Sequence, residues 1–165
     1  MPIVRAPIAN ARGAISTFAI SSETKRWLLS SGFNELDLDA VNKYRRTPLM
    51  SAAAGGHEQY VGELLSANVD IEAVNDDGNS AIWLACFSGN GRVIQMLTDA
   101  GANLDHQNPD GVTALMYASS AGKTKVVKQL VAAGANTRLR SKDDFSALDL
   151  ASNIDILRFL KAQPR

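Results

Sequence analysis

The amino-acid sequence predicts an all-α solenoid, in which similar helix–turn–helix units stack side by side in one continuous domain. Three observations predict this fold. The chain has 165 residues, of which 45% are hydrophobic and 21% charged, a composition typical of globular domains. A short motif recurs with a period of 33 residues. Small and apolar residues recur in phase with that motif, so each unit should have the same apolar faces.

The recurring motif begins with threonine or serine and continues with small and apolar residues. Its four copies are Thr47-Pro48-Leu49-Met50, Ser80-Ala81-Ile82-Trp83, Thr113-Ala114-Leu115-Met116 and Ser146-Ala147-Leu148-Asp149. Further columns keep the same step: Ala52, Ala85, Ala118 and Ala151; Gly56, Gly89 and Gly122; Leu64, Leu97 and Leu130; and Asn42, Asn75 and Asn108. Several independent columns in phase indicate a structural repeat, which no single short motif could do.

Each column of the repeat has a local structural reason. The Thr or Ser hydroxyl can cap a first helix by accepting a hydrogen bond from a free backbone N–H, and Pro48 suits the first helical position. The alanines let two helices approach closely, and the glycines suit a left-handed residue that ends the first helix. Asp77-Gly78 and Asp110-Gly111 predict tight turns. Arg45 and Asp144 occupy the slot of these turn glycines, so each must either tolerate a strained backbone or adopt another turn, which leaves the shape of these two fingers open.

In chain order, each unit is expected to contain a protruding turn, a short helix, a tight turn, a second helix and a return loop. The helices are predicted near residues 46–54 and 58–66, 79–87 and 91–100, 112–120 and 124–133, and 145–151 and 153–161. The divisions are an N-terminal arm and capping repeat at 1–42, full repeats at 43–75, 76–108 and 109–141, and a C-terminal capping repeat at 142–165. The last unit is shorter than the others, so its inter-helix turn should be reduced.

The N-terminal segment allows two interpretations. Residues 1–22 contain Arg5 and Arg12 but no acidic side chain, which weakly resembles a transit peptide. We favour the second interpretation, in which the segment begins the folded domain, because four apolar residues have nearly the spacing of one helix face. These residues are Ile8, Ile15, Phe18 and Ala19. Trp27 follows in the first capping unit, and we expect it to fill the cap rather than to bind a ligand.

The repeat resembles the ankyrin family, whose unit reads D-x-x-G-x-T-P-L-H-x-A-A-x-x-G-H, followed by an apolar helix and L-L-x-x-G-A-D. The matching residues are Thr47-Pro48-Leu49, Ala52-Ala53, Gly56-His57, Leu64-Leu65, Gly101-Ala102-Asn103 and Gly134-Ala135-Asn136. The match is close over residues 42–152 and looser toward both ends. The resemblance implies an ankyrin-repeat solenoid with protruding β-turn fingers, in which three full repeats lie between two degenerate capping units.

The resemblance also implies a binding surface, because ankyrin domains usually hold a protein partner on their concave side, across the turn tips and first helices. Carried over by position, this surface comprises Lys43, Tyr44, Arg46, Met50, Asp76, Asp77, Asn79, Trp83, Phe87, Ser88, Asp110, Val112 and Met116. Trp83 replaces the usual histidine, and Phe87 lies four residues later on the same helix face. With Tyr44 and Arg46, they supply the aromatic and arginine side chains typical of binding hot spots.

Two of these assignments leave alternatives open. Trp83 could pack over its neighbours Met50 and Met116 instead of binding a partner. Asp76 and Asp77 could accept a basic group of a partner, but acidic residues are also common turn formers.

The charges argue against nucleic acid as the partner. Lys plus Arg and Asp plus Glu each number 17, so the net charge is zero, whereas nucleic-acid binders usually have a basic surplus. The sum is −1 over residues 1–75, −3 over 76–108 and +4 over 109–165, which either sets the register of a partner or is ordinary scatter. The basic residues of the last third are interpreted as a solvated face, with an acidic partner as the minor alternative. They are Lys123, Lys125, Lys128, Arg138, Arg140 and Lys142.

The remaining composition bears on location and assembly. No apolar run approaches the ~18 residues that a membrane span needs, so no membrane association is expected. Cys86 is the only cysteine, so no internal disulfide can form, and a reducing cytoplasmic or nuclear compartment is expected. We expect a monomer.

An enzymatic function has few candidate residues. The only thiol nucleophile, Cys86, occupies a packed small-residue slot of a first helix, and a buried cysteine is inert. The candidate bases are His57 and His106. These three residues are too scattered for a zinc site, and the chain has no phosphate-binding loop or dinucleotide fingerprint, so no cofactor is expected.

The sequence therefore predicts a non-catalytic protein–protein interaction module that binds a protein partner through its concave surface. Three alternatives remain. The first is a small regulatory or inhibitory subunit of an enzyme or effector complex. The second is an enzyme that uses Cys86, and the third is a structural brace that would self-associate.

Overall fold

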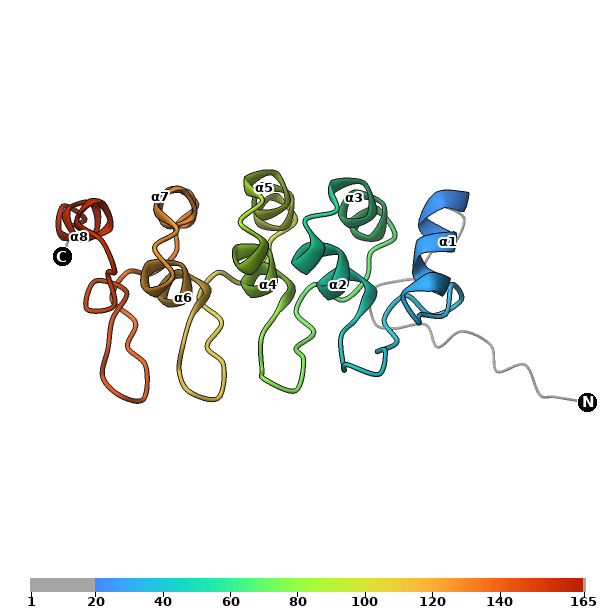
Figure 1. Cartoon of the computed structure of the whole chain (residues 1–165), viewed down its shortest axis with the longest axis horizontal. Helices are drawn as coiled ribbons and strands as arrows, with labels where there is room; N and C mark the ends of the chain where they lie inside the picture. Colours follow the sequence, from blue (N-terminus) through green and yellow to red (C-terminus); the bar gives the residue numbers. More distant parts are fainter. Residues whose placement is uncertain (1–19, 165) are drawn as a thin grey trace, which may run out of the picture.

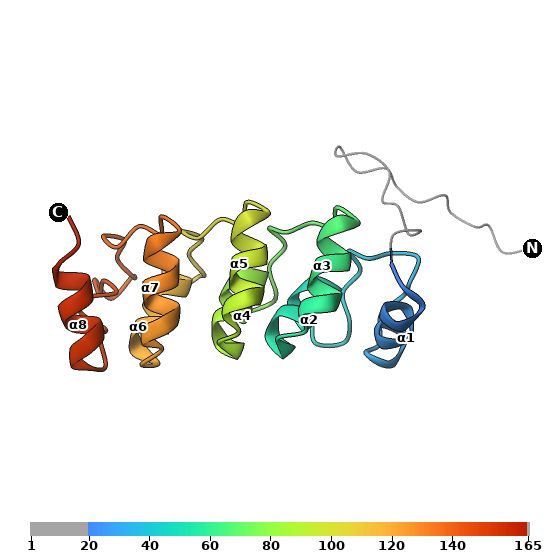
Figure 2. The same cartoon turned by 90° about the horizontal axis from the view of Figure 1, so that it is seen from above.

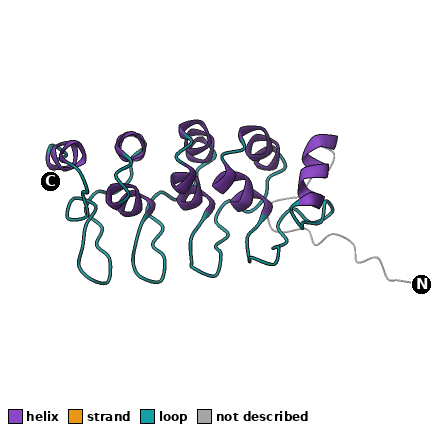
Figure 3. Ribbon diagram, viewed as in Figure 1, coloured by secondary structure: helices purple, strands orange, loops and turns teal. Residues whose placement is uncertain are grey.

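The structure, a computed structural model, describes residues 20–164 of the chain. Within them lie the helices α1 (Ser22–Ser30), α2 (Pro48–Gly55), α3 (Glu58–Ser66), α4 (Ala81–Ser88), α5 (Gly91–Asp99), α6 (Ala114–Ser120), α7 (Thr124–Ala132) and α8 (Ile154–Lys161). The described part has no strand, only an isolated antiparallel bridge between Val74 and Ser80 (Figure 3). The predicted all-α class is therefore confirmed. The apolar series expected between residues 8 and 19 lies outside the described residues.

The helices form two layers along the length of the molecule (Figure 1). The first helices of the full repeats, α2, α4 and α6, form one layer, in which α4 packs between the other two. The second helices, α3, α5 and α7, form the other layer, with α1 and α8 at the two ends of the row (Figure 2). The loops between repeats all project on the same side, as a row of fingers.

We call the fingers at residues 42–46, 75–79, 108–112 and 141–145, together with α2, α4 and α6, the finger–helix surface. Each finger is closed by a backbone hydrogen bond from the N–H of its first residue to the carbonyl of its last, at 2.9–3.1 Å. This surface corresponds to the concave side that the sequence predicted to bind a partner.

The boundaries of the first helices follow from their caps. Thr47 and Thr113 have extended backbones. Their hydroxyl oxygens accept hydrogen bonds from the backbone N–H groups three residues later, those of Met50 and Met116, at 3.3 and 3.2 Å. The helices therefore begin after these residues, about two positions later than predicted. Ser80 does not cap α4, contrary to expectation. Its hydroxyl is buried and has no hydrogen-bond partner among the described residues. Gly56 and Gly89 end α2 and α4 with left-handed backbones, as predicted.

The fingers retain one turn geometry although two of them lack the usual glycine. Gly78 and Gly111 have φ of 70° and 76°, and Arg45 and Asp144, in the same slot, have φ of 56° and 64°. Of the two outcomes that the sequence left open, a strained left-handed backbone or another turn, the structure has the first. Such a backbone costs a non-glycine residue about 1–2 kcal/mol, so the rest of the repeat must impose it.

The interior is built from the columns that recur in the sequence. The alanines of the first helices and the leucines of the second helices are fully buried, at 0% exposure: Ala52, Ala85, Ala118, Leu64, Leu97 and Leu130. The small alanines let the helices of neighbouring repeats approach closely. The leucines fill the layer between one second helix and the next, because each repeat buries its apolar face only against its neighbours.

A row of carboxylates ties the return loop of each repeat to the next repeat. Three side chains one repeat apart, Asp39, Glu72 and Asp105, accept hydrogen bonds from the backbone N–H groups of Asp70, Asn103 and Asn136, at 2.7, 2.9 and 2.7 Å. We call these three side chains the carboxylate ladder. Each bond gives a partner to a loop donor that secondary structure leaves unpaired.

The N-terminal capping unit is closed by aromatic side chains. Trp27 of α1 stacks on Tyr60 of α3 with ring centroids 4.5 Å apart, and it lies 6.1 Å from Phe33. Trp27 is partly buried and packs against the core. Its predicted role in filling the cap is therefore confirmed.

The C-terminal capping unit differs from the prediction. Residues 147–150 form a turn, so the helix predicted at 145–151 is wrong, whereas the one predicted at 153–161 is present as α8. The shorter chain leaves no room for a full first helix. Instead, the hydroxyl of Ser152 donates to the carbonyl of Ser119 at 3.0 Å, which holds this segment against α6. Asn153 then caps α8 by accepting from the N–H of Ile156 at 3.0 Å.

Candidate functional site

The fingers are shaped by the asparagines that begin them. Each asparagine side-chain oxygen accepts hydrogen bonds from the backbone N–H groups two and four residues later, at 2.9–3.3 Å. The three asparagines are Asn42, Asn75 and Asn108. These two hydrogen bonds to each asparagine side chain fix the turn locally. The residues at the finger tips are therefore held toward solvent by the backbone itself.

Neighbouring fingers are also joined to one another. Arg45 Nε lies 3.2 Å from Asp76 Oδ1, and the backbone N–H of Lys142 donates to the carbonyl of Asp110 at 2.9 Å. The Arg45–Asp76 pair is exposed, so it adds less than about 1 kcal/mol to stability. Among the described residues neither Asp77 nor the carboxylate of Asp110 forms an ion pair, and both residues are exposed. These two carboxylates therefore give the middle fingers an acidic edge.

An aromatic cluster lies on the helices behind these fingers. The ring centroids of Trp83 and Tyr117 are 4.4 Å apart, and those of Phe87 and Tyr117 are 6.4 Å apart. Phe87 remains 59% exposed, although its ring is large and apolar. Lys123 donates from Nζ to the carbonyl oxygen of Phe87 at 3.1 Å and fixes the end of α4 beside the cluster. We call Trp83, Phe87 and Tyr117 the aromatic cluster.

The indole of Trp83 has an unusual polar environment. Its Nε1 is buried and has no hydrogen-bond partner within the described residues, although the Trp83 side chain as a whole is only partly buried. A buried donor without an acceptor is costly, and tryptophan N–H groups usually find one. The indole N–H is therefore an unpaired donor enclosed beneath the aromatic cluster.

Tyr117 was missed by the sequence analysis. It stands one position after Met116, which shares a repeat column with Trp83, so counting by column assigns it to the neighbouring helix face. Burial raises the pKa of the Tyr117 phenol, and the nearby Cys86 adds to this effect. The size of the Tyr117 ring was the signal that could have revealed its place in the cluster, because a tyrosine at this position reaches the adjacent repeat.

The structure places the predicted partner-binding residues in three groups. The exposed ones are Lys43, Tyr44, Asp76, Asp77, Phe87 and Asp110, and the partly buried ones are Arg46, Trp83, Ser88 and Val112. The buried ones are Met50 and Met116, each 1% exposed, and Asn79, 6% exposed.

The outward orientation predicted for the buried group is wrong. Met50 and Met116 belong to the hydrophobic core, under the first helices. Asn79 is held inside the finger, where its N–H donates to Asn75 Oδ1 at 2.9 Å and its own Oδ1 accepts from Asn108 Nδ2 at 3.4 Å. Their roles are structural, because none of the three side chains reaches the surface.

The single aromatic and arginine patch predicted from the sequence is divided. The ring of Tyr44 lies 4.9 Å from Nζ of Lys43, at the first finger. No ring contact joins Tyr44 to the aromatic cluster in the part of the chain that the structure describes. Two separate groups of aromatic side chains therefore face the same surface, and the larger one is centred on Tyr117.

Cys86 lies in the core. It is 0% exposed, and burial raises the pKa of its thiol to about 12, although Lys123 acts in the opposite direction. The thiolate is the nucleophilic form, so a cysteine with this pKa is almost wholly protonated at neutral pH. His106, one of the candidate bases, places its Nε2 2.7 Å from the carbonyl oxygen of Gly78.

We predict that iodoacetamide alkylates Cys86 at least about 100-fold more slowly in the native chain than in the unfolded chain at pH 8, because the thiol is fully buried and burial raises its pKa, so little reactive thiolate is present. Mass spectrometry of samples quenched over time, with and without denaturant, measures the two rates. Equal rates in both samples would contradict the buried position and revive the cysteine-enzyme alternative.

The described residues also bear on metal binding and on membrane insertion. Within residues 20–164, no group of three or more His, Cys, Asp or Glu side chains is arranged to hold a metal ion. None of the helices described there combines the length and the apolar character needed to cross a membrane.

Comparison with known proteins agrees with the repeat architecture. A family model described as ankyrin repeats (3 copies) matches residues 14–108 and 90–164. The curated proteins include no match to this chain. Ankyrin repeats are generally protein–protein interaction modules and are typically not enzymes. Together, the two matched segments cover most of the chain, and this protein belongs to the ankyrin-repeat family.

Proposed function

We propose that this protein is a non-catalytic recognition module that holds a protein partner against the finger–helix surface, with the aromatic cluster as the main anchor. The observation that carries the proposal is the position of Phe87. Its ring is 59% exposed and stacks on Tyr117 beside Trp83. Tryptophan and tyrosine dominate binding hot spots, because they bury a large area and keep a polar handle.

The surroundings of the cluster support the same function. The exposed carboxylates of Asp77 and Asp110 lie on the fingers of the repeats that carry the aromatic rings. A polar rim around an apolar centre is the usual anatomy of a protein interface. Trp83, partly buried beneath these rings, gives the cluster a large apolar base. A regulatory or inhibitory subunit would use the same surface, so one test covers both forms of the proposal.

Replacing Phe87 with alanine should weaken partner binding by about 2 kcal/mol, roughly 30-fold in Kd, as expected for truncation of a central aromatic anchor. The partner is first isolated with the immobilised full chain and then purified, so that Kd can be measured by calorimetry. Because Phe87 is exposed, the fold should persist, which circular dichroism checks.

Leu29→Ala is the matched control for this experiment. Leu29 is also 59% exposed but lies on α1, in the N-terminal cap. It should bind the partner with unchanged affinity. The finger–helix surface would be the wrong assignment if Phe87→Ala bound normally and Leu29→Ala did not. Light scattering of the unbound chain should give the mass of a monomer, 17.6 kDa, whereas a structural brace would give a multiple of it.

A further inference from the structure

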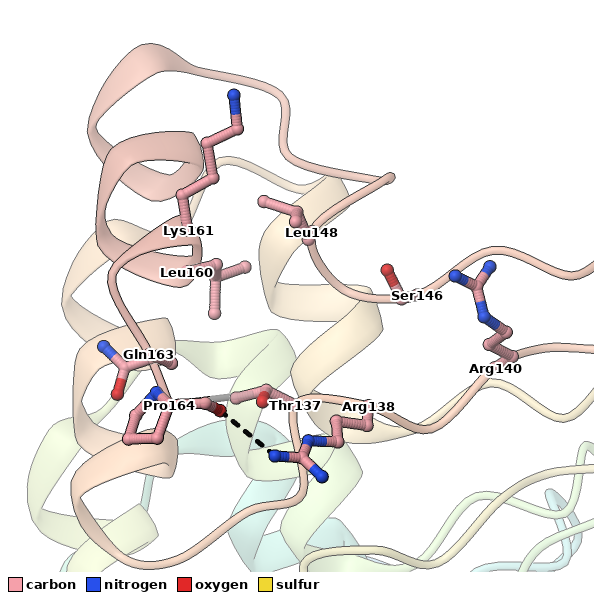
Figure 4. A pocket seen from close by; sticks show the side chains of 9 residues that line it. All are labelled: Thr137, Arg138, Arg140, Ser146, Leu148, Leu160, Lys161, Gln163 and Pro164. Carbon is pink, nitrogen blue, oxygen red and sulfur yellow. Dashed lines mark hydrogen bonds between the residues drawn. The ribbon is translucent and has the colours of Figure 1, made fainter.

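A cavity of about 530 Å³ opens at the C-terminal end of the stack, where Arg140 and Ser146, on either side of the last finger, form part of its lining (Figure 4). Leu148, Leu160 and Pro164 give it an apolar lining. Leu160 is 5% exposed and belongs to the core, whereas Leu148 is partly buried. Three basic side chains also line it, namely Arg138, Arg140 and Lys161, and no acidic residue does.

The cavity exists because the repeat that would cover this face is missing from the described stack. Leu148 is one repeat after Leu115, and Leu115 is 1% exposed because α6 lies inside the stack. The turn at 147–150 replaces the first helix of the last unit and leaves Leu148 only partly covered. The apolar lining of the cavity is thus a repeat interface without a neighbouring repeat.

The charge at this interface is inverted relative to the inner repeats. Arg138 stands one repeat after Asp105 and continues the column of the carboxylate ladder. Each inner member of this column accepts a hydrogen bond from the following repeat. At the end of the stack the acceptor is replaced by a cationic donor. Another unit of the same kind would present a backbone N–H here, which Arg138 cannot accept, whereas a carboxylate on a partner would fit it.

Two of the three cations are available to such a partner. Arg140 is engaged, since its Nη1 lies 3.5 Å from Asp144 Oδ1 and 3.4 Å from Asp149 Oδ2. Within residues 20–164, the Arg138 side chain hydrogen-bonds only to a backbone carbonyl, that of Pro164, at 3.4 Å. Lys161 forms no ion pair within the described residues. Figure 4 shows the Arg138 side chain beside Pro164, with Lys161 on the neighbouring helix.

The helix dipole of α8 does not cancel this positive charge. The negative end of the helix points toward the cavity, but its last carbonyls are already paired. The N–H of Ala162 donates to the carbonyl of Arg158 at 3.2 Å, and Gln163 Nε2 donates to that of Phe159 at 3.0 Å. The basic side chains therefore set the sign of the local potential.

We propose that this cavity is a second binding site, which takes an acidic segment of a partner protein. Carboxylates of the segment pair with Arg138 and Lys161, and an apolar side chain next to them packs on Leu148 and Leu160. The alternation of acid and apolar side chain distinguishes this occupant from a nucleic acid. Single-stranded nucleic acids need aromatic platforms for their bases, and no aromatic residue lines the cavity.

The test uses the full chain, labelled with ¹⁵N, and three blocked synthetic peptides. The first peptide contains the segment Asp-Leu-Glu-Asp-Leu between Gly-Ser ends. The second has lysine at every acidic position, and the third has serine at both leucines. The first peptide should shift the amide signals of residues 137–140 and 146–163 at millimolar concentration or below, and the other two should bind at least about 10-fold more weakly.

Charge reversal tests whether Arg138 and Lys161 bind the acidic peptide. The double variant Arg138→Glu with Lys161→Glu should weaken binding of the first peptide by at least about 10-fold, because both charge pairs become repulsive. Lys125→Glu, an exposed position on α7, is the matched control and should bind as the native chain does. Circular dichroism should show the same fold for both variants.

The proposal is overturned if the peptides bind equally, if none of them binds, or if the double variant binds as well as the control. It is also overturned, in favour of nucleic acid, if an oligouridylate of equal charge binds more tightly than the first peptide. This site is independent of the aromatic cluster. Phe87→Ala should leave peptide binding unchanged, so failure of one proposal does not imply failure of the other.

Discussion

Replacing Leu97 with alanine should lower the free energy of unfolding by about 3–4 kcal/mol, because the truncation leaves a cavity in a closely packed layer. Leu97 is 0% exposed and lies on α5, which packs between α3 and α7. Domains of this size are typically stable by about 5–15 kcal/mol, so a single substitution removes a large share of the total. Urea unfolding followed by far-ultraviolet circular dichroism measures the difference.

The control for this substitution is Leu29→Ala, which removes the same atoms from a side chain that is 59% exposed. It should change the stability by no more than about 0.5 kcal/mol. A small loss for Leu97→Ala, equal to that of the control, would show that the second helices do not pack as described. Because repeats touch only their neighbours, the weakened middle should also broaden the unfolding transition, as the two ends begin to unfold separately.

The full repeats could be predicted from the sequence because several columns each have one physical cause that recurs. Buried leucines, close-packed alanines and left-handed glycines each serve the same purpose in three successive units. The helix starts were predicted two residues early because the capping residues look helical in the periodic pattern but have extended backbones, as Thr47 does. The positive φ of Arg45 and Asp144 was one of the two outcomes that their slot allowed, and the repeat imposes it.

The last unit and the binding surface were less predictable, since both depend on contacts between repeats. Residues 147–150 lose their helix because a shortened connection ties Ser152 to α6, which the local sequence does not reveal. A repeat column gives a position but not an orientation. Trp83 and Met116 share one column, yet Met116 is buried and Trp83 is partly exposed on the ring of Tyr117.

The uneven charge of the sequence acquires a spatial meaning in the structure. The acidic middle of the chain includes Asp77 on the finger–helix surface, and the basic last third includes Arg138 and Lys161 at the end cavity. The acidic middle fingers and the basic end cavity therefore lie at different places on one stack. Their relative position depends on the fingers and the stack keeping their spacing.

That spacing should be lost when Gly111 is replaced with alanine, which we expect to cost about 2–4 kcal/mol of stability. Gly111 has φ of 76°, and a Cβ atom built there would lie 2.9 Å from the backbone nitrogen of Lys142 and 3.1 Å from Cα of Ser141. Both obstacles are backbone atoms of the next finger, so no side chain can move aside. The two fingers would have to separate, which breaks the hydrogen bond between Lys142 N–H and the carbonyl of Asp110.

Gly101→Ala separates the steric effect from the backbone effect. Gly101 also has a positive φ, 86°, but a Cβ atom there meets nothing within 4 Å. This variant should lose only the ~1–2 kcal/mol that alanine costs in a left-handed conformation. Urea unfolding of both variants gives the difference, and hydrogen exchange at the amide of Lys142 should accelerate in Gly111→Ala alone. Equal losses and equal exchange would mean that the third and fourth fingers do not touch, and the finger–helix surface would then be a set of independent loops rather than one rigid edge.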